Sequence, residues 1–352
     1  MQIEQYYSES EKYVLELIEN EGYPEEHPFN DYPDTPESMP ITILVFVYMF
    51  TKNKDMIKDY VVKCKGVEKG VFSDVKYKQG ISEISWLYYL LVGIIYNKKI
   101  KLIDIFDENK KLINNDKKFE YSLLLDSPSC ITAIEVKAIT CDPFFKEKGF
   151  SIEDGKKLIK PFFPQLKDSD FIKSQTDREI LQSSTYYWQL EQNIKRIAQK
   201  CAGENISGNK LYCFGVIFIN AATSFEEFYA YLFNEKYGLY HFVQDSKIDV
   251  LCLVSFDAKN DVKFDNIYKN GYVKTIIPHP SEELLEICKC LRMDNFIAVG
   301  DKINKYVLEK SKEEYGYYKI LCREGFLNII PDDASEDEIN DYVTYLKNKE
   351  VQ

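Results

Sequence analysis

The stretch FEYSLLLDSPSCITAIEVKAIT, residues 119–140, decides the expected fold of this chain. It holds two runs of apolar and β-branched residues, 119–125 and 131–139, separated by the turn-forming sequence DSPS. Such runs on either side of a short turn are typical of two antiparallel strands. The sequence therefore predicts a β-hairpin that turns at residues 127–129.

The second strand of this hairpin carries polar side chains on one face. Because successive side chains of a strand point to opposite sides, Glu135 and Lys137 share a face. The other face is expected to pack in the interior, and it comprises Ile134, Val136 and Ala138. Asp126 closes the first strand, so we expect the turn to bring its carboxylate beside that of Glu135.

A pair of converging carboxylates needs a positive partner. Two like charges at one point repel each other, so the arrangement is favourable mainly when a divalent cation lies between them. Oxygen ligands suit Mg²⁺ or Mn²⁺. Lys137 would then lie near the attacking water and stabilise the negative charge that develops on a phosphate. These parts suit the hydrolysis of a phosphodiester.

The elements around the hairpin predict an α/β fold for a central unit, residues 79–220. Their order is helix, strand, strand, strand, long helix and strand, at residues 81–96, 100–106, 119–125, 131–139, 177–201 and 211–219. This order is typical of a mixed sheet with helices on both faces.

The two ends of the chain have different patterns. Residues 1–78 are expected to form a helical N-terminal unit, with helices at 8–20, 41–51 and 55–63. Residues 221–352 form an α/β extension of the sheet or a separate lobe that selects the substrate. The strands expected there are 249–256, 273–277 and 317–321, and the helices are 225–232, 282–291, 302–314 and an acidic terminal helix.

The spacing of Asp126, Glu135 and Lys137, with the order of the six central elements, resembles the PD-(D/E)XK nucleases, a superfamily that includes restriction enzymes. The resemblance implies a restriction-endonuclease-like mixed sheet. It also implies that Asp126, Glu135 and the backbone carbonyl of Val136 bind Mg²⁺ or Mn²⁺, and that Lys137 assists the attacking water. Leu125 stands where the motif has proline. Coordinates that separate Asp126 from Glu135 would contradict this interpretation.

Two helices extend the resemblance. The predicted helix 81–96 holds one charged residue, Glu83, and members of the superfamily often place a glutamate on this helix as a further metal or water ligand. The alternative role is a first-turn acid that faces the helix dipole. In the long helix, Gln182 and Tyr186 have the spacing of the Q-x-x-x-Y motif of RecB-like exonucleases. The polar face that the resemblance assigns to nucleic acid continues through Gln189, Asn193 and Arg196.

That polar face has a second interpretation. An ordinary amphipathic helix with a solvated polar side would give the same pattern.

The charge of the chain bears on its partners. A net charge of -12 is unusual for a protein that binds phosphates. Acids concentrate near both ends, whereas lysines gather before the predicted hairpin, at positions 98, 99, 101, 110, 111, 117 and 118. These lysines either contact nucleic acid or lie on the solvent-exposed surface of a hairpin.

The other compositional features point to the cytoplasm. The 9 cysteines are scattered and the 3 histidines are isolated, which argues against disulfides and against a zinc site. The N-terminus lacks the pattern of a signal peptide, and the longest apolar runs are too short to span a membrane. We therefore expect a cytoplasmic protein with no membrane partner.

The sequence favours a divalent-metal-dependent DNA nuclease, and by analogy with the superfamily an endonuclease of bacterial restriction or antiviral defence. DNA is the expected partner, and a homodimer or a defence-complex partner protein is left open. Two alternatives remain. One is a non-catalytic interaction or DNA-binding protein on the same fold, in which the carboxylates are structural, and the other is an RNA-directed nuclease toxin.

Overall fold

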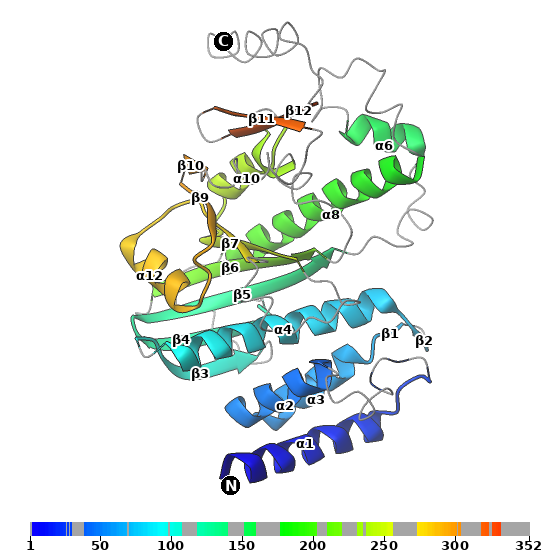
Figure 1. Cartoon of the computed structure of the whole chain (residues 1–352), viewed down its shortest axis with the longest axis vertical. Coiled ribbons are helices and arrows are strands. Elements are labelled where there is room, and N and C mark those ends of the chain that lie inside the picture. The colour runs from blue at the N-terminus through cyan, green and yellow to red at the C-terminus, as the bar shows by residue number, and fades with distance from the viewer. Residues whose placement is uncertain are drawn as a thin grey trace, which may run out of the picture.

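The chain forms a mixed β-sheet with helices on both faces (Figure 1), which confirms the predicted α/β class. The computed structural model describes residues 2–25, 27, 29, 39–68, 70–97, 99–107, 118–139, 151–159, 177–202, 210–219, 231–234, 237–255, 273–300, 302–303, 318–323 and 326–331.

The central sheet has eight strands in the order β10-β9-β8-β7-β6-β5-β4-β3. Their bounds are β3 Lys101–Asp107, β4 Tyr121–Ser127, β5 Ser129–Ile139, β6 Lys210–Ile219, β7 Val250–Ser255, β8 Val273–Ile277, β9 Phe296–Val299 and β10 Lys302–Ile303. Strand β5 pairs antiparallel with β4 and parallel with β6, and β6 pairs parallel with β7. Strands β7 to β10 therefore extend the sheet of the central unit, which is one of the two arrangements that the sequence left open.

Two small hairpins lie outside this sheet. They are formed by β1 Val67–Glu68 with β2 Val71–Phe72, and by β11 Tyr318–Arg323 with β12 Phe326–Pro331. The second hairpin includes the strand predicted at residues 317–321.

The helices cover both faces of the sheet. Their bounds are α1 Gln2–Glu21, α2 Met39–Thr51, α3 Lys54–Cys64, α4 Asp74–Tyr96, α6 Ile152–Ile159, α8 Asp177–Cys201, α10 Tyr240–Asp245 and α12 Glu282–Cys290. One buried apolar core joins α1, α2, α3, α4 and α12 to one sheet face, and a second joins α8 and α10 to the other. In Figure 1, α1 to α4 accordingly lie on one side of the strands and α8 on the other. None of the described helices is both long and apolar enough to cross a lipid bilayer.

Most of the predicted elements are confirmed, but α1 begins at Gln2 rather than at residue 8, and the unpredicted elements are β1, β2, β9, β12, α6 and α10. Two further elements differ from the prediction. Helix α4 begins at Asp74 rather than at residue 81, because Ser73 caps it and accepts a hydrogen bond from the backbone N–H of Lys76. Residues 302–303, the start of the predicted helix 302–314, form strand β10 instead. The rest of that segment, most of the predicted helix 225–232 and the acidic terminal helix lie outside the described residues.

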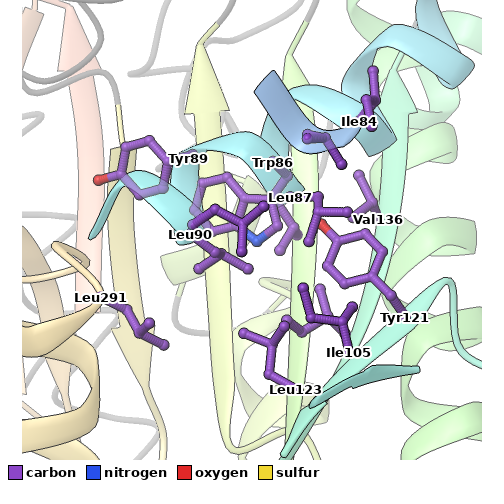
Figure 2. Close-up of a cluster of buried hydrophobic side chains, with 14 of the residues drawn as sticks. Ile84, Trp86, Leu87, Tyr89, Leu90, Ile105, Tyr121, Leu123, Val136 and Leu291 are labelled. Carbon is purple, nitrogen blue, oxygen red and sulfur yellow. The ribbon is translucent and has the colours of Figure 1, made fainter. Parts of the chain in front are cut away.

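Helix α4 anchors the larger core and connects the N-terminal helices to the sheet. Its buried apolar side chains pack against sheet residues, as Figure 2 shows for Ile84, Trp86, Leu87 and Leu90 near Tyr121, Leu123 and Val136. On its other side, α4 approaches α3 so closely that a Cβ on Gly80 would lie 2.8 Å from the carbonyl carbon of Lys63. This close approach brings the end of α3 to the residues of the site.

Candidate functional site

The β4–β5 hairpin turns where the sequence predicts, but its register moves Asp126 away from Glu135. Asp126 pairs with Ser129 beside the turn, and its exposed carboxylate lies 3.0 Å from Lys101 Nζ. Glu135 follows six residues after Ser129, which is about 20 Å along a strand. The expectation that these two carboxylates converge is wrong, because an antiparallel hairpin pairs residues that lie equally far from the turn. The nuclease interpretation as stated, with Asp126 as a metal ligand, fails with it.

Glu120 occupies the position expected for Asp126. The register ends with Tyr121 paired to Ile134, and the N–H of Glu120, the preceding residue, donates to the carbonyl of Ile134 at 3.1 Å, next to Glu135. Lys137 lies between the two acids, with Nζ 2.6 Å from Glu135 Oε1 and 3.5 Å from Glu120 Oε1. The carboxylate pair that the sequence predicts is therefore present with a different first member.

Helix α4 adds Glu83 and Gln79 to this edge of β5. The Nε2 group of Gln79 donates to Glu83 Oε1 at 2.7 Å and to the carbonyl of Val136 at 3.2 Å, while its Oε1 accepts from the N–H of Ala138 at 2.9 Å. Strand β5 continues past Ile134, the last of its residues that pairs with β4. Gln79 thus forms hydrogen bonds with backbone groups of β5 that lie beyond this pairing. The side chain of Val136 packs in the core, as predicted, whereas its carbonyl points to the site.

Two further lysines, from other helices, form ion pairs with these three glutamates. Lys63, from the last turn of α3, places Nζ 2.9 Å from Glu83 Oε2 and 3.1 Å from Glu120 Oε2. Lys200, from the end of α8, places Nζ 2.6 Å from Glu135 Oε2. We call this set the glutamate–lysine cluster, and its members are Glu83, Glu120, Glu135, Lys63, Lys137 and Lys200.

Burial and mutual charge perturb three of these groups. Burial, together with the charge of Glu120, raises the pKa of Glu83 to about 7, although Lys63 and Gln79 favour its ionised form. Burial also acts to raise the pKa of Glu120, but Lys63 and Lys137 outweigh it and hold this pKa below its ordinary value. For Lys137, burial acts to lower the pKa, and Glu135 and Glu120 outweigh it so that the pKa is raised. Glu120 and Lys137 are therefore charged at neutral pH, and Glu83 is poised between its two forms.

The donor chemistry of the cluster fits a divalent cation. Glu135 is fully buried, and its two oxygens lie 2.6 Å from Lys137 Nζ and 2.6 Å from Lys200 Nζ. With Glu120, Glu83 and the carbonyl of Val136 it supplies the oxygen ligands that Mg²⁺ and Mn²⁺ prefer. As arranged, the described residues contain no group of three or more His, Cys, Asp or Glu side chains that could hold a metal ion. A cation would therefore have to displace lysine ammonium groups from the carboxylates.

The predicted nucleic-acid face of α8 is not one exposed face. Tyr186 is 1 % exposed and packs in the apolar core, and Gln189 and Asn193 are also buried. Only Arg196 among the residues assigned to this face with a described side chain is exposed, and the side chain of Gln182 lies outside the described part of the chain. Burial of Tyr186, Gln189 and Asn193 therefore rules out one open surface shared with Arg196, while a role of these residues toward nucleic acid stays a prediction.

The lysines before the hairpin are partly engaged elsewhere. Lys99 pairs with Glu286 at 3.0 Å, and Lys101 pairs with Asp126. Lys118 is exposed two residues before Glu120. The lysines at 98, 110, 111 and 117 lie outside the described residues, as do most of the residues between β5 and α8.

Sequence reasoning missed four residues of the site. Glu120 could have been found by continuing the predicted hairpin register, whereas Lys63, Gln79 and Lys200 carry no local signal. Comparison of the chain with protein-family models, with curated proteins and with solved structures found no match.

Proposed function

We propose that this chain is a divalent-metal-dependent nuclease whose site is the glutamate–lysine cluster, with Glu120 in the role that the sequence assigned to Asp126. The observation that supports this most is the meeting of Glu120 with the Glu135-Val136-Lys137 motif at one edge of β5, with Glu83 beside them. The element order of the mixed sheet agrees with the same resemblance.

The residues of the cluster have different roles in the proposed reaction. Glu120, Glu135 and the carbonyl of Val136 would hold Mg²⁺ or Mn²⁺, and Glu83 would be a further ligand, directly or through water. When bound, such an ion withdraws charge from the phosphate and favours ionisation of the attacking water. Lys137 keeps its proton because the neighbouring acids raise its pKa, so it stabilises the growing negative charge and does not act as a base.

DNA is the proposed substrate. Exposed basic side chains occur close in sequence to the cluster, with Arg196 one helical turn before Lys200 and Lys118 two residues before Glu120. Such side chains contact phosphates without reading the base sequence. An endonuclease in bacterial restriction or antiviral defence is the setting that the superfamily resemblance favours.

The test is cleavage of supercoiled plasmid and linear DNA with Mg²⁺ or Mn²⁺, with RNA assayed in parallel. Glu120→Gln and Glu135→Gln should abolish cleavage, because each removes a charged ligand from a buried site. Asp126→Asn is the matched control and should cut at the wild-type rate, since Asp126 lies exposed at the far end of the hairpin. Loss of activity in Asp126→Asn with retention in Glu120→Gln would refute this assignment of the ligands.

A second candidate function follows from the charge balance of the cluster. Each glutamate already has a lysine within 3.1 Å of one of its oxygens, so the six residues also suit a buried ionic network that connects α3, α4, β5 and α8. On this alternative the chain is an interaction protein without catalysis. Calorimetry separates the two, because only the nuclease binds Mn²⁺ and loses that binding in Glu135→Gln.

A further inference from the structure

Lys63 brings the N-terminal helices into the glutamate–lysine cluster. Its ammonium group lies between two carboxylates, 2.9 Å from Glu83 Oε2 and 3.1 Å from Glu120 Oε2. A cation shared by these two acids would bind through their oxygen atoms. Lys63 therefore already engages one potential ligand atom on each acid.

The backbone of α3 and α4 determines this position. At Gly80 a Cβ would lie 2.8 Å from the carbonyl carbon and 2.9 Å from the carbonyl oxygen of Lys63, so the two helices are in backbone contact. Glu83 follows Gly80 by three residues and so lies on the same face of α4. The contact that places the backbone of Lys63 thus also presents Glu83 to its side chain.

The exposure of these side chains indicates which of them can move. The side chain of Lys63 is 31 % exposed, whereas those of Glu83 and Glu120 are 5 % and 10 % exposed. Lysine has a long flexible stem that can carry its charge back to water. The ammonium group can therefore leave the cluster while the two acids stay in place.

We propose that Lys63 is a built-in competitor of the divalent cation. It holds Glu83 and Glu120 together in the metal-free protein, and it is displaced from them when the ion binds. This inference rests on the proposed function, because it takes the cluster to be the metal site. The ammonium group both occupies ligand oxygens and repels a doubly charged ion at short range, so its removal should strengthen metal binding.

The experiment is a calorimetric titration of the full chain with MnCl₂ alone, without DNA. Lys63→Met should lower the dissociation constant for Mn²⁺ roughly tenfold or more, since a nearby like charge is removed. Lys63→Arg keeps the charge and should not show this gain. Lys65→Met is the matched control two residues along, where the side chain binds the carbonyl of Glu21 at 2.7 Å, and should bind Mn²⁺ as the wild type does.

A second uncharged variant tests the inference in case Lys63→Met does not fold. Lys63→Gln keeps a polar side chain that donates hydrogen bonds but carries no charge, and it should also bind Mn²⁺ more tightly than the wild type. Because a ligand that binds only the folded state stabilises it, Mn²⁺ should raise the melting temperature of both uncharged variants more than that of the wild type.

Failure of this inference and failure of the proposed function would give different results. If the wild type binds Mn²⁺ but Lys63→Met and Lys63→Gln bind it equally or more weakly, Lys63 organises the ligands and does not compete with the ion. That result overturns the inference and leaves the proposed function standing. If the wild type binds no Mn²⁺ and cuts no DNA, both are overturned.

Discussion

Replacing Gly80 with alanine tests the close contact between α3 and α4 that places Lys63 in the cluster. The new Cβ would lie 2.8 Å and 2.9 Å from the carbonyl carbon and oxygen of Lys63, and 3.1 Å from the backbone nitrogen of Cys64. All three are backbone atoms, so no side-chain rotation can relieve the overlap. The helices would have to move apart.

Two opposing terms decide the sign of this change. Alanine in a helix interior is more favourable than glycine by about 1 kcal/mol. Overpacking at a rigid contact costs about 1 to 3 kcal/mol. Because all three distances at Gly80 are shorter than van der Waals contact and involve backbone atoms, the upper part of that range applies. We therefore expect Gly80→Ala to lower the free energy of unfolding by about 1 to 2 kcal/mol.

The assay is urea denaturation followed by far-ultraviolet circular dichroism, with Gly93→Ala as the matched control. Gly93 lies in the same helix, but its nearest contact to an added Cβ is 3.2 Å, to the carbonyl oxygen of Leu291. The gain in helix propensity is the same at both positions, so Gly93→Ala should lose less stability than Gly80→Ala. A Gly80→Ala variant as stable as the wild type, or indistinguishable from Gly93→Ala, would refute the reasoning.

Three further predictions concern single residues. Burial raises the pKa of Glu83 from 4.5 to about 7, so its contribution to stability is full below pH 4.5 and falls by about 3 kcal/mol as the pH rises through 7. Glu83→Gln should remove this slope in urea denaturation of the metal-free protein, and an unchanged slope would contradict the prediction. Burial lowers the pKa of His27, whose ring bonds the carbonyl of Cys64 and the N–H of Phe29, so its contribution is full above pH 6.5 and is lost as the pH falls. His27→Gln should therefore destabilise the protein more at pH 7.5 than at pH 5, and a pH-independent loss would count against it. Lys137→Ala should bind Mn²⁺ at least as tightly as the wild type in calorimetry while DNA cleavage falls roughly a hundredfold or more, and wild-type turnover in this variant would exclude the proposed role.

The β4–β5 hairpin shows which features a local sequence pattern predicts and which it does not. Apolar alternation placed both strands, the turn, the shared face of Glu135 and Lys137 and the buried side chain of Val136. Proximity along the chain then suggested Asp126 as the partner acid, although the same turn already implied Glu120. Each step away from a hairpin turn adds one residue on both strands, so the register alone assigns the partner.

The helix faces show a different limit. The sequence predicts the length of α8 and its polar and apolar positions, but whether a polar position is exposed depends on what packs against the helix. Gln189 and Asn193 are buried, and α8 packs against α6, β5 and β6, neighbours that cannot be inferred from the periodicity of α8 itself.

By itself, the sequence determined most elements of the central unit, their order and the two motif residues on β5, because these depend on neighbours within a few positions along the chain. Only the tertiary structure decided that Lys63, Gln79 and Lys200 complete the site. These side chains come from three separate helices, and their positions depend on how the apolar faces of those helices are buried against the sheet. Ion pairs between residues so far apart in the sequence depend on how the helices pack against the sheet. A local sequence pattern does not contain that information.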